Sequence, residues 1–121
     1  MESELRFFDI AKKLSKKSTY VHQLGAVVVK KRKPVGFGYN QPNKTHPKSN
    51  NRFQTVHAEL HAILGLTRED TLGATIYVYR EHKNGIPANS KPCQYCQMII
   101  KEAGIKRVCY TGDGKYEEYV V

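Results

Sequence analysis

The sequence predicts an α/β sandwich, a five-stranded mixed sheet with helices on its faces. Its 121 residues are enough for one sizeable hydrophobic core but not for two, so we interpret residues 1–121 as a single domain. Segments with helical periodicity alternate with short runs rich in β-branched residues. The three-residue turn Gly112-Asp113-Gly114 joins the last two runs, and a turn that short makes them antiparallel.

The N-terminal third is predicted to be a helix followed by a β-hairpin. Residues from about 2 to 17 carry apolar side chains at helical spacing, namely Leu5, Phe8, Ala11 and Leu14. Two strand-like runs, 24–29 and 35–39, flank a basic turn that is either solvated or in contact with a phosphate. The second run contains Gly36 and Gly38, and such glycines often mark the close approach of another backbone or of a ligand.

Residues 40–55 form a long polar loop in this prediction, because prolines and asparagines interrupt any regular pattern. A loop of this length in a small domain is usually functional, and we interpret it as one wall of a substrate pocket. The alternative is an ordinary surface loop. The side chains that it would bring to the pocket are Lys44, His46, Lys48, Arg52 and Phe53.

The second half of the chain is predicted to continue as helix, strand, helix and hairpin. We expect Thr55 to cap a helix that begins near Val56 and ends at Gly65 or within 67–70. The clearest strand, 74–80, leads through a second long loop, 81–91, to another helix. That helix would have Pro92 at its first position, Gly104 at its end and an apolar side made of Met98, Ile99, Ile100 and Ala103. The final hairpin would pair 106–111 with 115–121.

The composition restricts the partners and the compartment. Twenty Lys and Arg against eleven Asp and Glu leave a net charge of +9, which favours an anionic partner such as a nucleic acid or a phosphorylated small molecule. A basic surface that serves only solubility is the alternative. No apolar run approaches the length needed to span a bilayer and the first residues lack a secretory pattern, so we expect a soluble cytoplasmic protein without a membrane partner.

Two short motifs contain the residues of a zinc site. His57-Ala58-Glu59 is followed 36 positions later (93 minus 57) by Pro92-Cys93-Gln94-Tyr95-Cys96. A catalytic zinc takes three protein ligands and leaves its fourth position to water, and His57, Cys93 and Cys96 supply three. The two cysteines are three residues apart, so they share one face of the predicted helix. We expect the electropositive helix N-terminus to lower their pKa and favour the thiolate.

Glu59 is predicted to move protons rather than to bind the metal. It is two positions after His57, about 200° around an ideal helix, whereas two ligands on one helix are better placed three or four residues apart. Zinc would bring the pKa of its water to about 7. Glu59 could then accept that proton as a general base and deliver it to a leaving group as a general acid.

Two other kinds of zinc site use similar residues. Proteases with a His-Glu-x-x-His motif place Glu directly after the first His, but Ala58 has that position here, so we interpret His61 as a packed or hydrogen-bonded helix residue. A structural zinc site normally has four protein ligands. The spare candidates are His22, His46, His82 and Cys109, and Cys109 alternates with Val108 in a predicted strand, which favours a core position.

These motifs together resemble those of the zinc-dependent cytidine deaminase superfamily, whose signature is His-x-Glu followed by Pro-Cys-x-x-Cys. The resemblance extends from about Leu24 to Tyr110 and includes the strand-like segments 25–29 and 74–78 and the Gly-Tyr-Asn at 38–40. It implies a three-layer α/β/α fold of the cytidine deaminase type. It also implies a homo-oligomer, because members of the superfamily often complete the pocket with a neighbouring subunit.

The resemblance also implies roles for individual residues. His57, Cys93 and Cys96 would bind Zn²⁺, and Glu59 would protonate the ring nitrogen and then the departing ammonia. Asn40 matches the asparagine that contacts the sugar or base, and the backbone amide of Ala58 would meet the carbonyl or ring edge of the base. The reaction implied is the replacement of a ring amine by water.

No subgroup of the superfamily matches throughout. The tRNA adenosine deaminases usually have Glu before Pro-Cys, where this chain has Lys91, and APOBEC-type enzymes usually have Ser there and aromatic-rich loops. Tetrameric cytidine deaminases share the final antiparallel hairpin but generally have Cys in place of His57. Deoxycytidylate deaminases share His-Ala-Glu, yet most have parallel final strands and an added helix.

We therefore predict a deaminase that acts on a free cytosine nucleoside or nucleotide of the cytidine, deoxycytidine or dCMP type. Its basic loops would hold a phosphate if the substrate has one. One alternative is a nucleic-acid base deaminase acting on single-stranded DNA or RNA, or on tRNA adenosine, since the charge is +9 and Phe53 and Tyr95 are available for stacking on a base. A remote alternative is an inactive zinc-bound binding module, which would have no use for Glu59.

Overall fold

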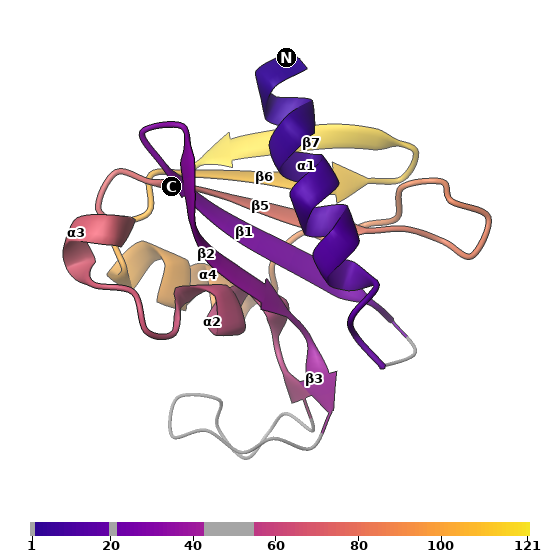
Figure 1. The fold of residues 1–121 in the computed structure, drawn as a ribbon, viewed down its shortest axis with the longest axis horizontal. Coiled ribbons are helices and arrows are strands. Elements are labelled where there is room, and N and C mark those ends of the chain that lie inside the picture. Colours follow the sequence, from indigo (N-terminus) through magenta and orange to yellow (C-terminus); the bar gives the residue numbers. More distant parts are fainter. Residues whose placement is uncertain (1, 20–21, 43–54) are drawn as a thin grey trace.

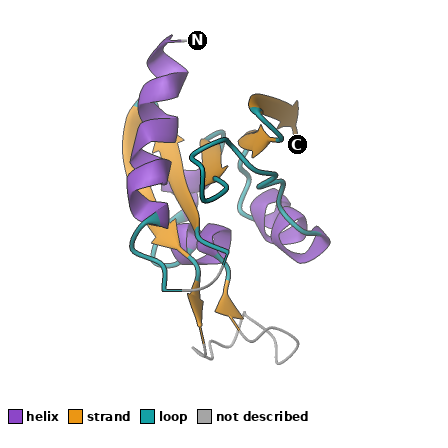
Figure 2. Ribbon diagram, turned by 90° about the vertical axis from the view of Figure 1, so that its right-hand side faces the viewer, coloured by secondary structure: helices purple, strands orange, loops and turns teal. Residues whose placement is uncertain are grey.

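Helix α1 (Glu2–Ser15) crosses one face of a five-stranded sheet, and the remaining helices cover the opposite face (Figure 1). The computed structural model describes residues 2–19, 22–42 and 55–121. Viewed from the side, α1 and the other helices lie on opposite sides of the strands (Figure 2). The predicted three-layer α/β/α sandwich is therefore confirmed.

The sheet is mixed, as predicted. Its order is β2 (Lys33–Tyr39), β1 (Leu24–Lys30), β5 (Thr75–Arg80), β6 (Arg107–Gly112) and β7 (Lys115–Val120). β5 and β6 are parallel, because α4 (Gln94–Glu102) connects them across one face, and every other pair is antiparallel. The predicted antiparallel C-terminal hairpin is confirmed.

Two hydrophobic clusters hold the three layers together. On one face, the α1 side chains of Phe7, Phe8 and Ala11 pack against Val27 and Tyr77 of the sheet. The opposite cluster joins α2 (Ala58–Ile63) and α4 to the sheet through Ala26, Val28, Ala58, Ala62, Ala74, Ile76, Val78, Ile100, Ile105 and Val108. The predicted burial of Leu5 was wrong: it is 39% exposed, and Phe7 takes the buried position.

Gly36 and Gly38 are where α2 rests on the sheet. A Cβ at position 36 would lie 2.3 Å from the carbonyl oxygen of Ala62, and one at position 38 would lie 2.4 Å from that of Ala58. The interpretation of these glycines as points of close backbone approach is confirmed. Since α2 follows directly on His57, this contact also positions the first metal-ligand candidate.

Several element boundaries differ from the prediction. Thr55–Val56 forms a two-residue strand, β4, that pairs with β3 (Gln41–Pro42), so α2 begins at Ala58 instead of near Val56. Of the two predicted ends of that helix, Gly65 is confirmed, because it directly follows the C-cap Leu64 and has a φ of +86°. The other, 67–70, belongs to the short helix α3 (Arg68–Thr71), which begins there because Thr67 and Asp70 form a reciprocal capping box.

Helix α4 begins two residues later than predicted. Pro92 precedes the N-cap residue Cys93 and so lies outside the helix. Met98 is 51% exposed, so it does not belong to the buried side formed by Cys96 and Ile100. The predicted stop at Gly104 is confirmed, because Gly104 has a φ of +83° directly after the C-cap. Within the described residues, none of the helices has the length and apolar character needed to cross a bilayer.

Candidate active site

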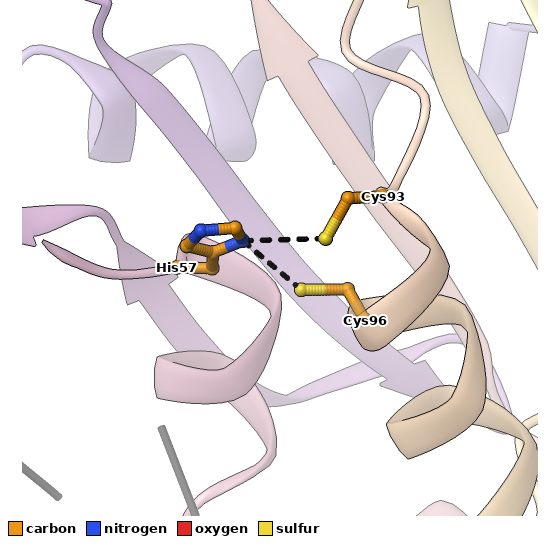
Figure 3. A group of neighbouring side chains, drawn as sticks. All are labelled: His57, Cys93 and Cys96. Atoms are coloured by element: carbon orange, nitrogen blue, oxygen red, sulfur yellow. Dashed lines mark hydrogen bonds between the residues drawn. The ribbon is translucent and has the colours of Figure 1, made fainter. Parts of the chain in front are cut away.

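The three proposed zinc ligands meet where the first turns of α2 and α4 lie side by side (Figure 3). His57 is the N-cap residue of α2 and Cys93 that of α4, and both have extended backbone angles. The His57 Nδ1 atom is 3.6 Å from the sulfur of Cys93 and 3.3 Å from that of Cys96. Side chains separated by 36 positions or more in sequence therefore converge on one point.

This geometry fits a tetrahedral zinc ion. Zn–S and Zn–N bonds of ~2.3 and ~2.0 Å at a tetrahedral angle place the two ligand atoms about 3.5 Å apart, close to the two distances in this structure. The three ligand atoms of His57, Cys93 and Cys96 all lie within 4.8 Å of one another. In the part of the chain that the structure describes, this group has three members, which is the number of protein ligands typical of a catalytic zinc site.

Of the four spare ligand candidates of a structural site, the three that the structure describes do not join this group. Cys109 is buried in β6 as predicted, in hydrogen-bond contact with Arg107, and it packs with Phe7 and Phe8 on the α1 face. His22 lines the neighbouring pocket and His82 is an exposed loop residue, whereas His46 lies outside the described residues.

Burial shifts the pKa of two of the ligand candidates, His57 and Cys96. Desolvation lowers the pKa of His57, which favours the neutral imidazole that metals bind. The pKa of Cys96 is raised, first by burial and then by the nearby Glu59 and Cys93, which corrects our expectation that the helix terminus would lower it. Metal binding must therefore displace a proton from Cys96, which makes the affinity for zinc depend on pH.

Glu59 lies within the site as a buried carboxyl, only 3% exposed. Burial raises its pKa to about 7, while hydrogen bonds from its own backbone N–H and from Cys96 oppose that shift. Both Glu59 and His57 line a single pocket of about 220 Å³. A carboxyl that is buried beside a metal site and open to a pocket is suited to carrying protons to and from a bound ligand.

The pocket is formed by residues from distant parts of the chain: His22, Leu24, Asn40, His57, Ala58, Glu59, Lys91 and Cys93. Asn40 is buried and links two segments. Its side-chain oxygen accepts a hydrogen bond from the Leu24 N–H (2.9 Å), and its side-chain nitrogen donates one to the His22 carbonyl (2.6 Å). Among the described residues the second amide hydrogen of Asn40 has no acceptor, so it is available to a ligand.

The other predicted site residues have different positions. Ala58 lines the pocket, and the contact of its backbone amide with a base stays a prediction. Tyr95 is half-buried on α4 but does not line this pocket, and Phe53 lies outside the described residues with most of the predicted 40–55 wall. His61 is a hydrogen-bonded helix residue, as predicted, and its Nδ1 accepts from the Tyr39 N–H at 3.1 Å.

Three pocket residues, His22, Leu24 and Lys91, were not proposed as site residues from the sequence. Lys91 directly precedes the Pro-Cys motif, and this adjacency was an available signal. His22 has no local signal, because it reaches the pocket only through the pairing of β1 with β2 and the Asn40 contact.

Known proteins resemble this chain in both sequence and fold. A family model described as the cytidine and deoxycytidylate deaminase zinc-binding region matches residues 1–112. The chain belongs to this deaminase family. The deaminase is therefore a zinc-dependent hydrolase of the predicted superfamily, and His57, Cys93 and Cys96 can form its metal site.

Among its relatives, the deoxycytidylate deaminase of Mycobacterium phage D29 is 35% identical over 108 residues, covering 73% of this chain and 77% of the phage protein. The human deoxycytidylate deaminase is 33% identical over 79% of this deaminase, which spans 56% of the human enzyme.

Solved structures agree with this assignment. The dCMP deaminase of cyanophage S-TIM5 has a TM-score of 0.67 and 25% identity, covering 90% of this chain and 82% of that protein. Cytidine deaminase from Burkholderia pseudomallei has a TM-score of 0.71 at 21% identity, covering 96% and 91%, and so shares the fold.

Proposed function

We propose that this deaminase converts deoxycytidylate to deoxyuridylate with release of ammonia. The observation that carries the proposal is the buried Glu59 carboxyl, which faces a pocket beside His57 and Cys93. The choice of a nucleotide rests on the relatives, since the phage and human proteins are both named deoxycytidylate deaminases. The cyanophage enzyme has also been solved with dCMP and dUMP bound.

The proposed reaction adds water at the amine-bearing carbon of cytosine and breaks the bond from that carbon to the amine. His57, Cys93 and Cys96 would hold a zinc ion, which would lower the pKa of a bound water to about 7. Glu59 accepts a proton from this water and donates it to the ring nitrogen. Glu59 then carries the second proton to the amine, which leaves as ammonia, and a carbonyl remains in its place.

The rest of the pocket would orient the substrate. The free amide hydrogen of Asn40 would donate to the sugar or base, because the other hydrogen and the oxygen of this side chain are held by His22 and Leu24. The backbone N–H of Ala58 belongs to the first turn of α2, where amides have no partner within the helix, and would donate to the carbonyl of the base. Both contacts would orient the nucleoside part of the substrate, and neither would distinguish a nucleotide from a nucleoside.

A substrate panel tests the proposal. Zinc-loaded protein is incubated separately with deoxycytidylate, cytidylate, deoxycytidine, cytidine, and single-stranded DNA and RNA, and the uracil product is quantified. We expect deoxycytidylate to have the highest kcat/KM. Turnover of polynucleotide alone would establish the nucleic-acid deaminase instead, which the +9 charge favours. Bound zinc without product from any substrate would indicate the inactive binding module.

Mass measurement in solution tests the homo-oligomer that we propose alongside this activity. If the active enzyme had the mass of a single chain, the proposed homo-oligomer would be contradicted.

A further inference from the structure

Lys91 has a fixed backbone position at the pocket that contains Glu59. Its N–H donates to the side-chain oxygen of Asn89 at 3.0 Å. The preceding residue, Ser90, is 2% exposed, and its hydroxyl donates to the Val78 carbonyl at 2.8 Å and accepts from the Thr111 N–H at 2.8 Å. Since Pro92 restricts the backbone on the other side, Lys91 cannot move away from the pocket without breaking these contacts.

The Lys91 side chain is oriented by the aromatic ring of Tyr119. The Lys91 Nζ lies 5.8 Å from the ring centroid, within the range of a cation–π attraction. Tyr119 is opposite Val108 in the β6–β7 ladder and packs against the same core cluster as Ala58 and Ile100. The C-terminal hairpin thus positions a positive charge beside the active site.

Arg80 connects the other basic group of the pocket to the same loop. One of its terminal nitrogens is 3.1 Å from the Nδ1 of His22, and the other donates to the Asn89 carbonyl at 3.2 Å. A guanidinium only donates, so the Nδ1 of His22 accepts and the ring N–H is on Nε2. Arg80 therefore keeps His22 and the 89–91 segment together. The Nε2–H of His22 is left as a second hydrogen-bond donor beside Lys91.

The positive charges here are not neutralised by acidic side chains. Among the ion pairs of residues 2–19, 22–42 and 55–121, none includes Arg80 or Lys91. Glu59 is the acidic residue that lines the pocket, and it belongs to the site of proton transfer. Arg80 contacts neutral acceptors and Lys91 lies over the ring of Tyr119, so among the described residues neither charge is compensated. Two such cations beside a ligand pocket are suited to binding an anion.

We propose that Lys91 and His22, with Arg80 as their positioning residue, form the subsite for the 5′-phosphate of the substrate. This inference rests on the proposed function and assigns the preference for a nucleotide to particular residues. The pocket of about 220 Å³ is smaller than the ~300–1,000 Å³ of sites that enclose drug-sized ligands. The base can therefore occupy the pocket while the phosphate lies at its mouth, against Lys91.

Matched charge removals test this subsite. The measured quantity is the ratio of kcat/KM for deoxycytidylate to kcat/KM for deoxycytidine. We expect Lys91→Gln to lower the ratio about tenfold or more, as expected for the loss of one charge-assisted contact to phosphate. Lys83→Gln removes the same charge from the same loop at an exposed position outside the pocket, and should leave the ratio unchanged. An unchanged ratio in Lys91→Gln, or an equal fall in Lys83→Gln, would overturn the subsite.

Arg80 and Tyr119 allow two further tests of positioning. Arg80→Gln should lower the ratio and Arg80→Lys should restore part of it, with thermal unfolding confirming that both variants fold. Tyr119→Leu removes the ring and should lower the ratio, whereas Tyr119→Phe keeps the ring and should not. Equal ratios in all four variants would contradict the positioning roles of both residues.

A binding measurement separates failure of this subsite from failure of the proposed function. Zinc-loaded protein is titrated with deoxyuridylate and with deoxyuridine by calorimetry. We expect wild type to bind the nucleotide at least tenfold more tightly, and Lys91→Gln to lose that difference. If wild type turned over no deoxycytidylate, the proposed function would fail, while this binding difference would still support the subsite. Equal affinity of wild type for both ligands would refute the subsite whatever the enzyme turns over.

Discussion

The backbone of Gly38 in β2 lies directly against that of Ala58 in α2, so a Cβ at position 38 would be 2.4 Å from the Ala58 carbonyl oxygen. The same Cβ would also be 2.4 Å from the Ala62 nitrogen, so no rotation of a flexible side chain could relieve the clash. Since α2 begins directly after His57 and contains Glu59, the glycine sets the depth of both residues in the site.

Gly38→Ala is expected to displace α2 and to damage the metal site. Overpacking of this kind costs about 1–3 kcal/mol, and the displaced helix should weaken zinc binding. Thermal unfolding and zinc content per chain measure the two effects. The control is Gly65→Ala, where a Cβ meets nothing within 4 Å and the φ of +86° adds strain alone. That control should lose about 1–2 kcal/mol but keep its zinc, and equal zinc content in both variants would contradict the role of Gly38.

Cys96→Ala is expected to abolish stoichiometric zinc binding. Cys96 is fully buried, its sulfur is 3.3 Å from the Nδ1 of His57, and among the described residues it is one of the three members of the ligand group. Metal analysis of the purified protein measures zinc per chain. Cys109→Ala is the matched control, because Cys109 is also buried but lies with the α1 cluster, and it should retain one zinc. One zinc per chain in Cys96→Ala would reject the ligand assignment.

Glu59→Gln is expected to keep zinc and to lose turnover. The amide has nearly the same shape but cannot carry protons, and loss of a general acid–base group costs about 10²–10⁴-fold in rate. The comparison variant is Glu69→Gln, which makes the same chemical change at an exposed position of α3. Zinc content and kcat on deoxycytidylate are the two readouts. Near-normal turnover by Glu59→Gln would disprove the proton-shuttle role.

The stability contributed by Glu81 is expected to disappear in acid. Burial alone would raise the pKa of this carboxyl, but hydrogen bonds from Lys16 and Tyr79 and the charges of Lys16 and Lys12 outweigh it and hold the pKa below 4.5. The folded state therefore binds this proton less readily than the unfolded state. Its stabilisation is fully present above pH 4.5 and is lost as the pH falls through the lower folded value.

A comparison of Glu81→Gln with wild type measures this contribution. Because the lysines are half-exposed, we expect the variant to lose no more than about 1 kcal/mol, or a few degrees in Tm, at pH 7. The difference should narrow as the pH is lowered below 4.5. A Tm difference that stayed constant from pH 7 to pH 3 would show that packing, rather than charge, is what the substitution removes.

The chemistry of this deaminase could be predicted from the sequence because it depends on local spacing. His57 and Glu59 are two residues apart, Cys93 and Cys96 three apart, and each pair begins a helix. The five strands were likewise visible as β-branched runs bounded by turns. The boundary errors fell at helix starts. Thr55 suits an N-cap, but this residue pairs with β3 as part of β4, so α2 begins later. Pro92 suits the first position of a helix, but Cys93 is the N-cap of α4, so that helix also begins later.

What the sequence by itself determined is the fold class and the deaminase family, since each strand-like run and each of the motifs at 57–59 and 92–96 consists of residues close together in the chain. Only the tertiary structure decided which residues line the pocket beside the ligand group. His22, Asn40 and Lys91 come from segments up to 69 positions apart (91 minus 22), and strand pairing, the Asn40 hydrogen bonds and the Arg80 contacts bring them to one pocket. No local pattern records such a meeting, because it depends on the register of the sheet and on the packing of α2 against Gly38.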